Sequence, residues 1–260
     1  MYEGDVMDSE LVLPRQEQLI LDLHELAQSV EPIARCLDAS KSGQFVHPDG
    51  RTEDLGSHRF QPSQLALISY LSQQCPKPLS VEVGFGMGSV SSVILGSRIS
   101  VGEPFQHLIF DPYGLGNGKG DVVQDYFKSV FGESFNRIWK PSEIGLAELV
   151  GVSGRGVAGL IFIDGGHLFE NVMVDFVLAD LLCCLGGFIV FDDAWFPAIE
   201  TTVNYLKSNR ADYIFSESSA PNMCIMQKVS RDKREWSSFK PFEVPDRSDF
   251  TPRPGMKWTD

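Results

Sequence analysis

Positive charge is scarce in this sequence. Its 22 Lys and Arg residues face 35 Asp and Glu residues, which gives a formal net charge of −13 over 260 residues. A nucleic-acid surface needs a basic patch that neutralises phosphates. The one dense group of basic side chains lies at 231–234. The charge balance therefore predicts a protein without a nucleic-acid partner.

Cysteine and long hydrophobic runs are also scarce. The five cysteines include an adjacent pair, Cys183 and Cys184, in an apolar run, a pattern that suits neither a zinc site nor a disulfide framework. The most apolar stretch, 176–191, is too short to span a bilayer and is interrupted by Asp180. The first residues, MYEGDVMDSE, are acidic, unlike a secretory signal. These features predict reduced core thiols in a cytoplasmic protein with no membrane partner.

The N-terminal part carries a helical pattern followed by a long irregular stretch. Apolar residues recur from Leu19 to Leu37 in steps of three and four, which predicts one helix stripe that Pro32 should kink or split. This helix either covers the main sheet or forms a dimer arm. Residues 41–61 show no periodicity and predict a lid or a disordered loop. We expect its two histidines to be solvated, although a lid histidine above a substrate stays open; they are His47 and His58.

A glycine turn is the most informative local feature. The stretch 81–89 reads VEVGFGMGS: a β-branched run meets Gly84, Gly86 and Gly88, and a helix-compatible segment begins at Ser89. Glycine has no Cβ and accepts positive φ, so backbone there can approach a nucleotide-like ligand. A dinucleotide-binding turn would require glycine at position 89. The pattern alone fits either a nucleotide-binding turn or a tight turn in an α/β sheet.

Strand and helix patterns alternate along the rest of the chain. Such alternation predicts a parallel sheet with right-handed crossovers. The connection at 217–222 is too short for a helix, so the last two strands should pair antiparallel. The predicted strands are 79–83, 107–110, 137–140, 159–163, 187–191, 213–216 and 223–228, and the predicted helices are 62–74, 89–95, 121–131, 142–150, 169–184 and 194–208.

Acidic residues follow several of these strands. In an open α/β sheet, ligands bind outside the carboxyl ends of the strands. Asp111 can accept both hydroxyls of a ribose there, or begin an Asp-Pro turn. Asp164 follows one strand, and Asp192 and Asp193 follow another. Because neighbouring strands lie about 4.8 Å apart, these three carboxylates should share a cation or have a raised pKa.

Oxygen ligands favour Mg²⁺, Mn²⁺ or Ca²⁺ over zinc. Structural interpretations compete with this one. Asp193 could cap the next helix, Asp164 could order its loop, and His167 could be a packed histidine. Trp195 and Phe196 could wall a substrate site or pack in the core.

Together these motifs resemble a known enzyme family. VEVGFGMGS, FDPYG and IDGGHLFENVMVDFVLADLLCCLGGFIVFDDAWFPAI resemble the small-molecule S-adenosylmethionine (SAM) methyltransferases related to the macrolide-sugar and aminocoumarin-sugar O-methyltransferases. They also resemble the cephalosporin-hydroxylase-like group on the same fold. The resemblance covers about 62–228. It implies an α/β Rossmann-like SAM-methyltransferase fold, with a mostly parallel seven-stranded sheet, an antiparallel last strand and an N-terminal helical extension.

The resemblance also implies roles for single residues. His167 would be the catalytic base, although some sugar methyltransferases carry an aspartate base where Gly166 stands here. Carboxylates at Asp164, Asp192 and Asp193 would hold Mg²⁺. Ser142 matches a position where relatives touch the adenine of SAM. The residues implied to bind SAM are Glu82, Gly84, Phe85, Gly86, Gly88, Ser89, Asp111, Ser142 and Asp164.

We therefore predict a SAM-dependent O-methyltransferase acting on a hydroxyl of a small molecule, such as a sugar or phenolic natural product. A metal-dependent enzyme of another reaction type and a non-catalytic SAM-binding protein are the alternatives, and a homo-oligomer stays open. The predicted division is a helical extension with its lid loop at 1–61, a SAM-binding methyltransferase domain at 62–229 and a C-terminal arm at 230–260.

Overall fold

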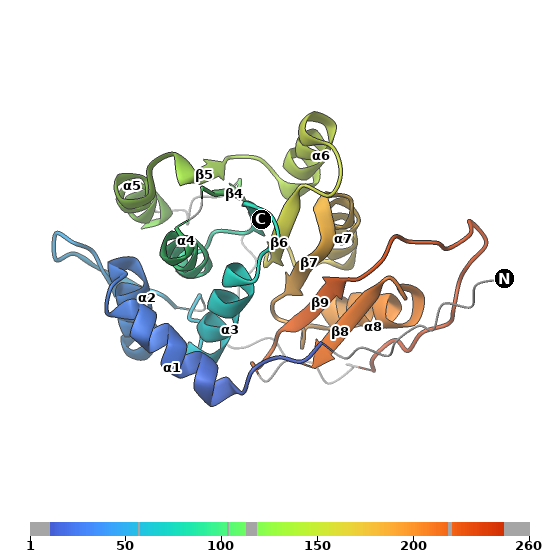
Figure 1. Cartoon of the computed structure of the whole chain (residues 1–260), viewed down its shortest axis with the longest axis horizontal. Helices are drawn as coiled ribbons and strands as arrows, with labels where there is room; N and C mark the ends of the chain where they lie inside the picture. The colour runs from blue at the N-terminus through green and yellow to red at the C-terminus, as the bar shows by residue number, and fades with distance from the viewer. Residues whose placement is uncertain (1–10, 57, 103, 113–118, 218–219, 247–260) are drawn as a thin grey trace.

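The computed structural model describes residues 11–56, 58–102, 104–112, 119–217 and 220–246. A seven-stranded sheet with the strand order β5-β4-β3-β6-β7-β9-β8 runs through its centre (Figure 1). Its strands are β3 (Leu79–Val83), β4 (Gln106–Phe110), β5 (Phe135–Ile138), β6 (Ala158–Ile163), β7 (Cys183–Phe191), β8 (Tyr213–Glu217) and β9 (Cys224–Lys228).

Strand directions follow the prediction. The neighbouring pairs from β5 to β7 are parallel, and β9 is antiparallel to both β7 and β8. The chain winds outward from β3 through β4 to β5, then returns to β6 on the other side of β3. The switch in winding direction therefore falls between β3 and β6, where ligands bind in such sheets. The predicted α/β fold with an antiparallel last strand is confirmed.

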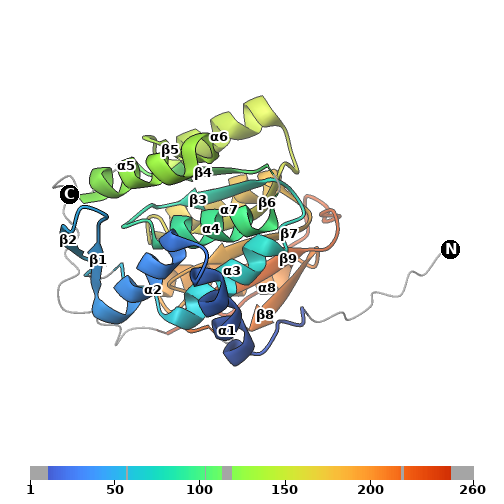
Figure 2. The ribbon, with the colours of Figure 1, turned by 60° about the vertical axis from the view of Figure 1, so that its left-hand side comes forward.

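Helices cover both faces of this sheet (Figures 1 and 2). On one face, apolar side chains of the first four helices pack against β6, β7 and β9, and α5 packs beside them on β4 and β5. On the other face, the last three helices pack on side chains of β3, β4, β6, β7, β8 and β9. The helices are α1 (Gln16–Ala27), α2 (Glu31–Ser42), α3 (Pro62–Gln73), α4 (Ser89–Val101), α5 (Lys119–Phe131), α6 (Ser142–Ser153), α7 (Phe169–Leu182) and α8 (Pro197–Asn209), with a 3₁₀ turn at Gly132–Ser134.

Pro32 splits the N-terminal helical pattern, as predicted. The first helix ends at Ala27 and the second begins at Glu31, with the proline in its first turn, where no intrahelical N–H is needed. Leu19 and Leu37 of the predicted stripe are 3% exposed and pack in the core with α3 and α4. The stripe therefore covers the fold of its own chain.

Residues 41–61 contain a hairpin, so the alternative of a disordered loop is wrong, and the lid stays a prediction. The short strands β1 (Gln44–Val46) and β2 (Thr52–Asp54) pair antiparallel. Both are three residues long, too short to produce a readable alternation. His47 is 2% exposed and packs edge-on against Phe45, so the expectation that it is solvated is also wrong. His58 is exposed.

The cysteines behave as core thiols. Four of the five are buried, and none is disulfide-bonded. Cys183 and Cys184 begin β7, whereas the sequence pattern placed them at the end of the preceding helix. The apolar run of α7 continues into β7 with no polar residue between them, so the sequence pattern does not show where the helix ends and the strand begins. Within the described residues, we find no helix with the length and apolar character that crossing a bilayer requires.

The described part of the C-terminal arm, 230–246, runs along α8 without regular structure (Figure 1). Asn209 fixes it through two hydrogen bonds with the backbone of Lys240, at 2.7 and 2.9 Å. Phe242 packs on Tyr205, with ring centroids 5.4 Å apart. Trp236, by contrast, is fully exposed. Residues 247–260 of the predicted arm lie outside the described residues.

Candidate functional site at the carboxyl edge of the sheet

The carboxyl ends of four neighbouring strands are level at one edge of the sheet. Val83 of β3 pairs with Phe110 of β4 and Ile163 of β6, and Ile163 pairs with Phe191 of β7. The residue after each of these positions therefore reaches the same edge. Those residues are Gly84, Asp111, Asp164 and Asp192.

All three glycines of the turn have positive φ: 86° at Gly84, 49° at Gly86 and 74° at Gly88. A Cβ at Gly84 would lie 2.0 Å from the backbone oxygen of Asp164, and one at Gly88 would lie 2.6 Å from an aromatic ring of α5. Packing alone therefore requires glycine at these two positions. The nearest atom to a Cβ at Gly86 is Nδ1 of His58, at 3.1 Å. Gly86 is the position where a missing side chain leaves space for a ligand.

His58 covers this space. Together with Phe60 and Ser89, it lines a cavity of about 10 Å³ beside the glycine turn, which is room for about one water molecule. A ligand that approaches Gly86 therefore has to displace the exposed His58 side chain. A larger hollow of about 380 Å³ lies at the opposite end of the strands, beside Pro78.

Glu82 lies in a buried polar network beneath the turn. Its Oε2 accepts a hydrogen bond from the Ser91 hydroxyl at 2.7 Å and lies 2.7 Å from Nε2 of His107. Ser80 Oγ contacts Nδ1 of the same ring at 2.9 Å. Burial raises the pKa of Glu82, although His107 acts in the opposite direction. Glu82 also lines the small cavity, but Oε2 is engaged by this internal network.

Asp111 accepts hydrogen bonds from a backbone N–H and from a buried arginine. Its Oδ2 accepts hydrogen bonds from the backbone N–H of Phe85 and from Nη2 of Arg137, both at 3.2 Å. The guanidinium lies over the rings of Phe85 and Trp139, 4.7 and 4.0 Å from their centroids. The Arg137 side chain is 1% exposed. The buried guanidinium of Arg137 thus fixes the Asp111 carboxylate, which is expected to bind a ribose. Phe85 holds the same carboxylate through its backbone N–H, while its ring packs in the core.

Two serines begin helices at this edge. Ser89 is the first residue of α4, and Ser142 is the first residue of α6 and is half-buried. The N-terminal end of a helix carries partial positive charge and unpaired N–H groups. Both helix starts can therefore receive acceptor atoms of a ligand.

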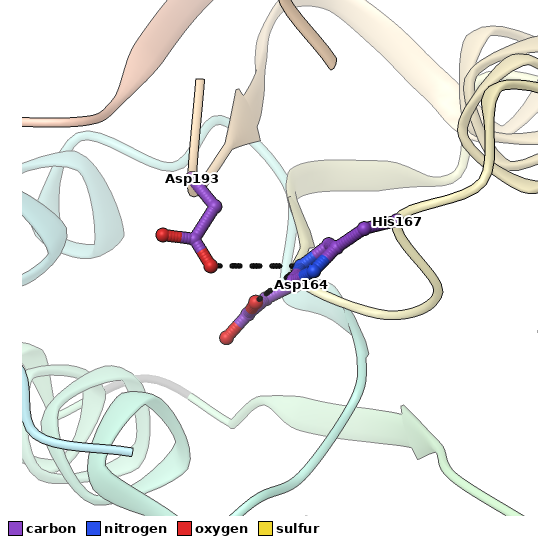
Figure 3. Close-up of side chains that lie close together, drawn as sticks. All are labelled: Asp164, His167 and Asp193. Carbon is purple, nitrogen blue, oxygen red and sulfur yellow. Dashed lines mark ion pairs between the residues drawn. The ribbon is translucent and has the colours of Figure 1, made fainter. Parts of the chain in front are cut away.

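Asp164, His167 and Asp193 meet at the end of β6 and β7, as Figure 3 shows. Nε2 of His167 lies 3.8 Å from Oδ1 of Asp164 and 3.6 Å from Oδ2 of Asp193. One ligand atom of each residue lies within 4.8 Å of the other two. Two carboxylate oxygens and an imidazole nitrogen at this spacing can surround a divalent cation.

Asp192, the other acid expected in this group, has a different partner. Its Oδ1 accepts a hydrogen bond at 3.2 Å from Nε2 of Gln64, in the first turn of α3. The same Gln64 side chain accepts from the backbone N–H of Gln61, at 2.9 Å. The structure therefore brings two of the three predicted carboxylates together with His167, and ties Asp192 to the segment that leads from the lid into α3.

The electrostatics of the cluster match the crowding of its acids. Burial raises the pKa of Asp164 to about 6, and the charge of Asp193 adds to the rise, even though 29% of the Asp164 side chain is exposed. Burial and both neighbouring aspartates raise the pKa of Asp192 well above its usual value. Burial lowers the pKa of His167, but the carboxylates of Asp164 and Asp193 outweigh it, and the net direction is upward. A cation would relieve this repulsion.

Asp193 is held in a strained position. Its φ is +51°, a region that non-glycine residues seldom adopt and that is found at functional sites. Trp195 Nε1 donates a hydrogen bond to its Oδ1 at 2.9 Å, and Phe196 packs on the His167 ring with centroids 4.6 Å apart. The N-cap of α8 is Phe196, so the interpretation of Asp193 as a helix cap is wrong.

Sequence reasoning missed several residues of the site, Gln64 and Arg137 above all. Gln64 is an ordinary polar residue in a predicted helix, and its contact with Asp192 spans 128 positions. Arg137 is the first residue of the predicted strand 137–140. No local pattern could identify either residue, because each partner is set by the strand order and not by sequence spacing.

Comparison with known proteins places the fold in a class. No protein-family model matches the chain, and no curated protein does. Solved structures do match: the Bacillus cereus O-methyltransferase in complex with S-adenosylhomocysteine (SAH) has a TM-score of 0.58 and 12% identity, covering 83% of this chain and 100% of that one. The SAH-bound Podospora anserina methyltransferase has a TM-score of 0.56 and 12% identity, covering 85% and 100%.

A sugar-modifying enzyme is among these neighbours. The TDP-rhamnose 3′-O-methyltransferase of calicheamicin biosynthesis matches with a TM-score of 0.53 and 14% identity, covering 86% of this chain and 99% of that one. The chain thus has the fold of the SAM-dependent methyltransferases. More particularly, its structural neighbours include small-molecule O-methyltransferases, NovP among them. At these identities the likeness defines the fold.

Proposed function

We propose that this protein is a SAM-dependent O-methyltransferase that acts on a hydroxyl of a small molecule, a sugar or a phenolic natural product, with help from a divalent cation. One observation carries the proposal: the glycine turn and the acid cluster touch. Gly84 packs so closely on the backbone of Asp164 that no side chain fits between them. A cofactor seated on the turn would therefore lie directly beside Asp164, His167 and Asp193.

The residues of this edge fit the proposed cofactor. SAM, when bound, supplies an activated methyl group on sulfur. Gly86 and Ser89 line the space that its methionine end would enter once His58 moves aside. Asp111, fixed by Arg137, would accept the ribose hydroxyls. The start of α6 at Ser142 would meet the adenine, as the resemblance implies.

The acid cluster fits a hard divalent cation such as Mg²⁺. Asp164 and Asp193 would hold it, and Asp192 would join them after releasing Gln64. The cation, when bound, supplies positive charge that orients a substrate hydroxyl and lowers its pKa. The raised pKa values of Asp164 and Asp192 support this role, because acids that repel one another are the ones a cation stabilises.

His167 would accept the proton of the substrate hydroxyl at Nε2, the atom that faces both carboxylates. Phe196 holds the ring from one side, and Trp195 fixes Asp193 beside it. These aromatic side chains would also exclude water from the reacting oxygen. Most of the rate would come from holding that oxygen about 3 Å from the methyl carbon.

The first test is calorimetric titration of the full-length protein with SAM and SAH, with and without Mg²⁺. It is followed by methyl transfer from labelled SAM to a panel of phenols and nucleotide sugars. We expect the protein to bind both ligands and to transfer the methyl group to one class of acceptor. Chelator should suppress this transfer. Absence of SAM and SAH binding would contradict the proposal. Binding without transfer to any acceptor would favour a non-catalytic SAM-binding protein, and a metal-dependent product without SAM consumption would favour another reaction on this fold.

A further inference from the structure

Asp175 is a buried carboxylate without a hydrogen-bond partner among the described residues. It lies in the second turn of α7, is 1% exposed, and neither of its side-chain oxygens has a partner. Burial raises its pKa to about 6, and the nearby Ser142 hydroxyl acts in the opposite direction. A buried charged group without partners is costly. Such a group is therefore a candidate for ligand recognition.

The surroundings of Asp175 connect it to the carboxyl edge. Ser142 and Glu143 begin α6, which packs against α7. On the other side lies Gly165, directly after Asp164. A Cβ at Gly165 would lie 3.7 Å from Oδ2 of Asp175. The nearest atom to that Cβ position is Cγ1 of Val83, at 2.7 Å, so the carboxylate lies beside the backbone that directly follows Asp164 and near the last residue of β3.

We propose that Asp175 accepts a hydrogen bond from the exocyclic amine of the cofactor's adenine and selects adenine over purines with a carbonyl at that position. This inference rests on the proposed function, which puts the adenine beside Ser142. The amine has hydrogen-bond donors, and Asp175 is an acceptor in its ionised form. A buried acceptor rejects a ligand that offers another acceptor, because two lone pairs then face each other without a proton.

The test compares SAH with S-inosylhomocysteine, in which a carbonyl replaces the amine. Calorimetry at pH 8 with the full-length protein measures both affinities. We expect wild type to prefer SAH by about 10–100-fold, the range of one hydrogen bond to a charged group. Asp175→Asn should weaken SAH by a similar factor and bring the two ligands within about threefold, since an amide can donate to the carbonyl.

Two further variants keep the test decisive. Glu143→Gln changes an exposed acid in the same turn of α6 as Ser142 and should keep the wild-type preference. Asp175→Ser, whose hydroxyl can donate or accept, should lose the preference as the Asn variant does. A thermal unfolding scan establishes that each variant is folded.

The outcomes separate this inference from the proposed function. A folded Asp175→Asn protein that keeps the wild-type ratio of the two affinities would overturn the role of Asp175 and leave the cofactor assignment standing. An equal loss of both ligands would also overturn it, because that pattern marks a structural role. If wild type binds neither ligand, the cofactor assignment and this inference fail together.

Discussion

Nη2 of Arg137 lies 3.2 Å from Oδ2 of Asp111, and the guanidinium lies over the rings of Phe85 and Trp139. The arginine is almost completely buried, so the ion pair is shielded from solvent salt. The pair joins the ends of two neighbouring parallel strands. It fixes the orientation of the carboxylate before any ligand arrives, which lowers the entropic cost of binding.

Removing this arginine should weaken the cofactor site. In Arg137→Met, the side chain keeps an unbranched apolar stem but loses the guanidinium and its charge, so Asp111 loses the hydrogen bond from Nη2. We expect SAH affinity to fall about tenfold or more, with a smaller loss for an analogue that lacks both ribose hydroxyls. Lys140→Met is the control, because Lys140 lies close in the chain but pairs with Glu148 at the surface. Equal losses for both ligands would remove Asp111 from the ribose.

Gly86 should be the glycine whose substitution affects the ligand most directly. In Gly86→Ala, the new Cβ enters the space beside His58, and we expect SAH affinity to fall at least tenfold. Gly102→Ala is the matched control: it also has positive φ, 76°, but apart from its chain neighbours no atom of the described residues lies within 4 Å of its Cβ position. Both variants should lose some stability from backbone strain. Calorimetry that finds unchanged SAH affinity in folded Gly86→Ala would contradict the assignment of the turn.

The order of strands and helices could be predicted because local patterns determine it. The glycine turn at Gly84, the helix split at Pro32 and the short connection before β9 each have a local physical cause. The hairpin at 44–54 could not be predicted, since its strands are too short to show alternation and its cohesion comes from packing on α2.

The partners of the site residues were beyond sequence reasoning for a different reason. The acids at strand ends were identifiable from topology alone, but a carboxylate's rotamer depends on every neighbour it meets. Asp192 meets Gln64 of α3, and Asp111 meets Arg137 of β5. Asp175 had no signal either, because a polar residue on an apolar helix is identified as buried only once α6 is packed against it.

Divalent cations should stabilise the native protein. Mg²⁺ that binds Asp164 and Asp193 in the native state alone raises the free energy of unfolding by RT ln(1 + [Mg²⁺]/Kd). At about 100 times Kd this is about 2.7 kcal/mol, or a rise in Tm of several degrees. A variant with Asn at Asp164, Asp192 and Asp193 should lose the response and be more stable than wild type in chelator. Calorimetric scans with Mg²⁺ and with chelator measure both. A wild-type protein indifferent to chelator in stability and activity would contradict the cation site.

Asp175 should make stability fall as pH rises. Its pKa is about 6 in the folded protein against an ordinary 3.8, so the native state holds the proton more tightly than the unfolded chain. Its favourable contribution is complete below about pH 4 and is lost as pH rises through about 6. Relative to Asp175→Asn, wild type should lose about 2–3 kcal/mol of unfolding free energy between pH 4 and 7. Urea titrations of both proteins across this range measure the change, and a constant difference would be incompatible with a buried titrating carboxyl.

His167 should carry the proton transfer. Its Nε2 faces Asp164 and Asp193, which hold its pKa above the ordinary value, so kcat/KM should rise with pH as the imidazole loses its proton. His167→Ala should lower kcat/KM by about 10²–10⁴ and flatten this rise, while SAH affinity stays within a few-fold. A matching loss of Mn²⁺ affinity would instead make His167 a ligand of the cation.

If the variant keeps both rate and pH profile, His58 is the next candidate for the base, because it lies exposed above Gly86. His47 is buried against Phe45 and cannot reach a substrate without rearrangement. The double variant of His167 and His58 then decides whether either imidazole takes the proton.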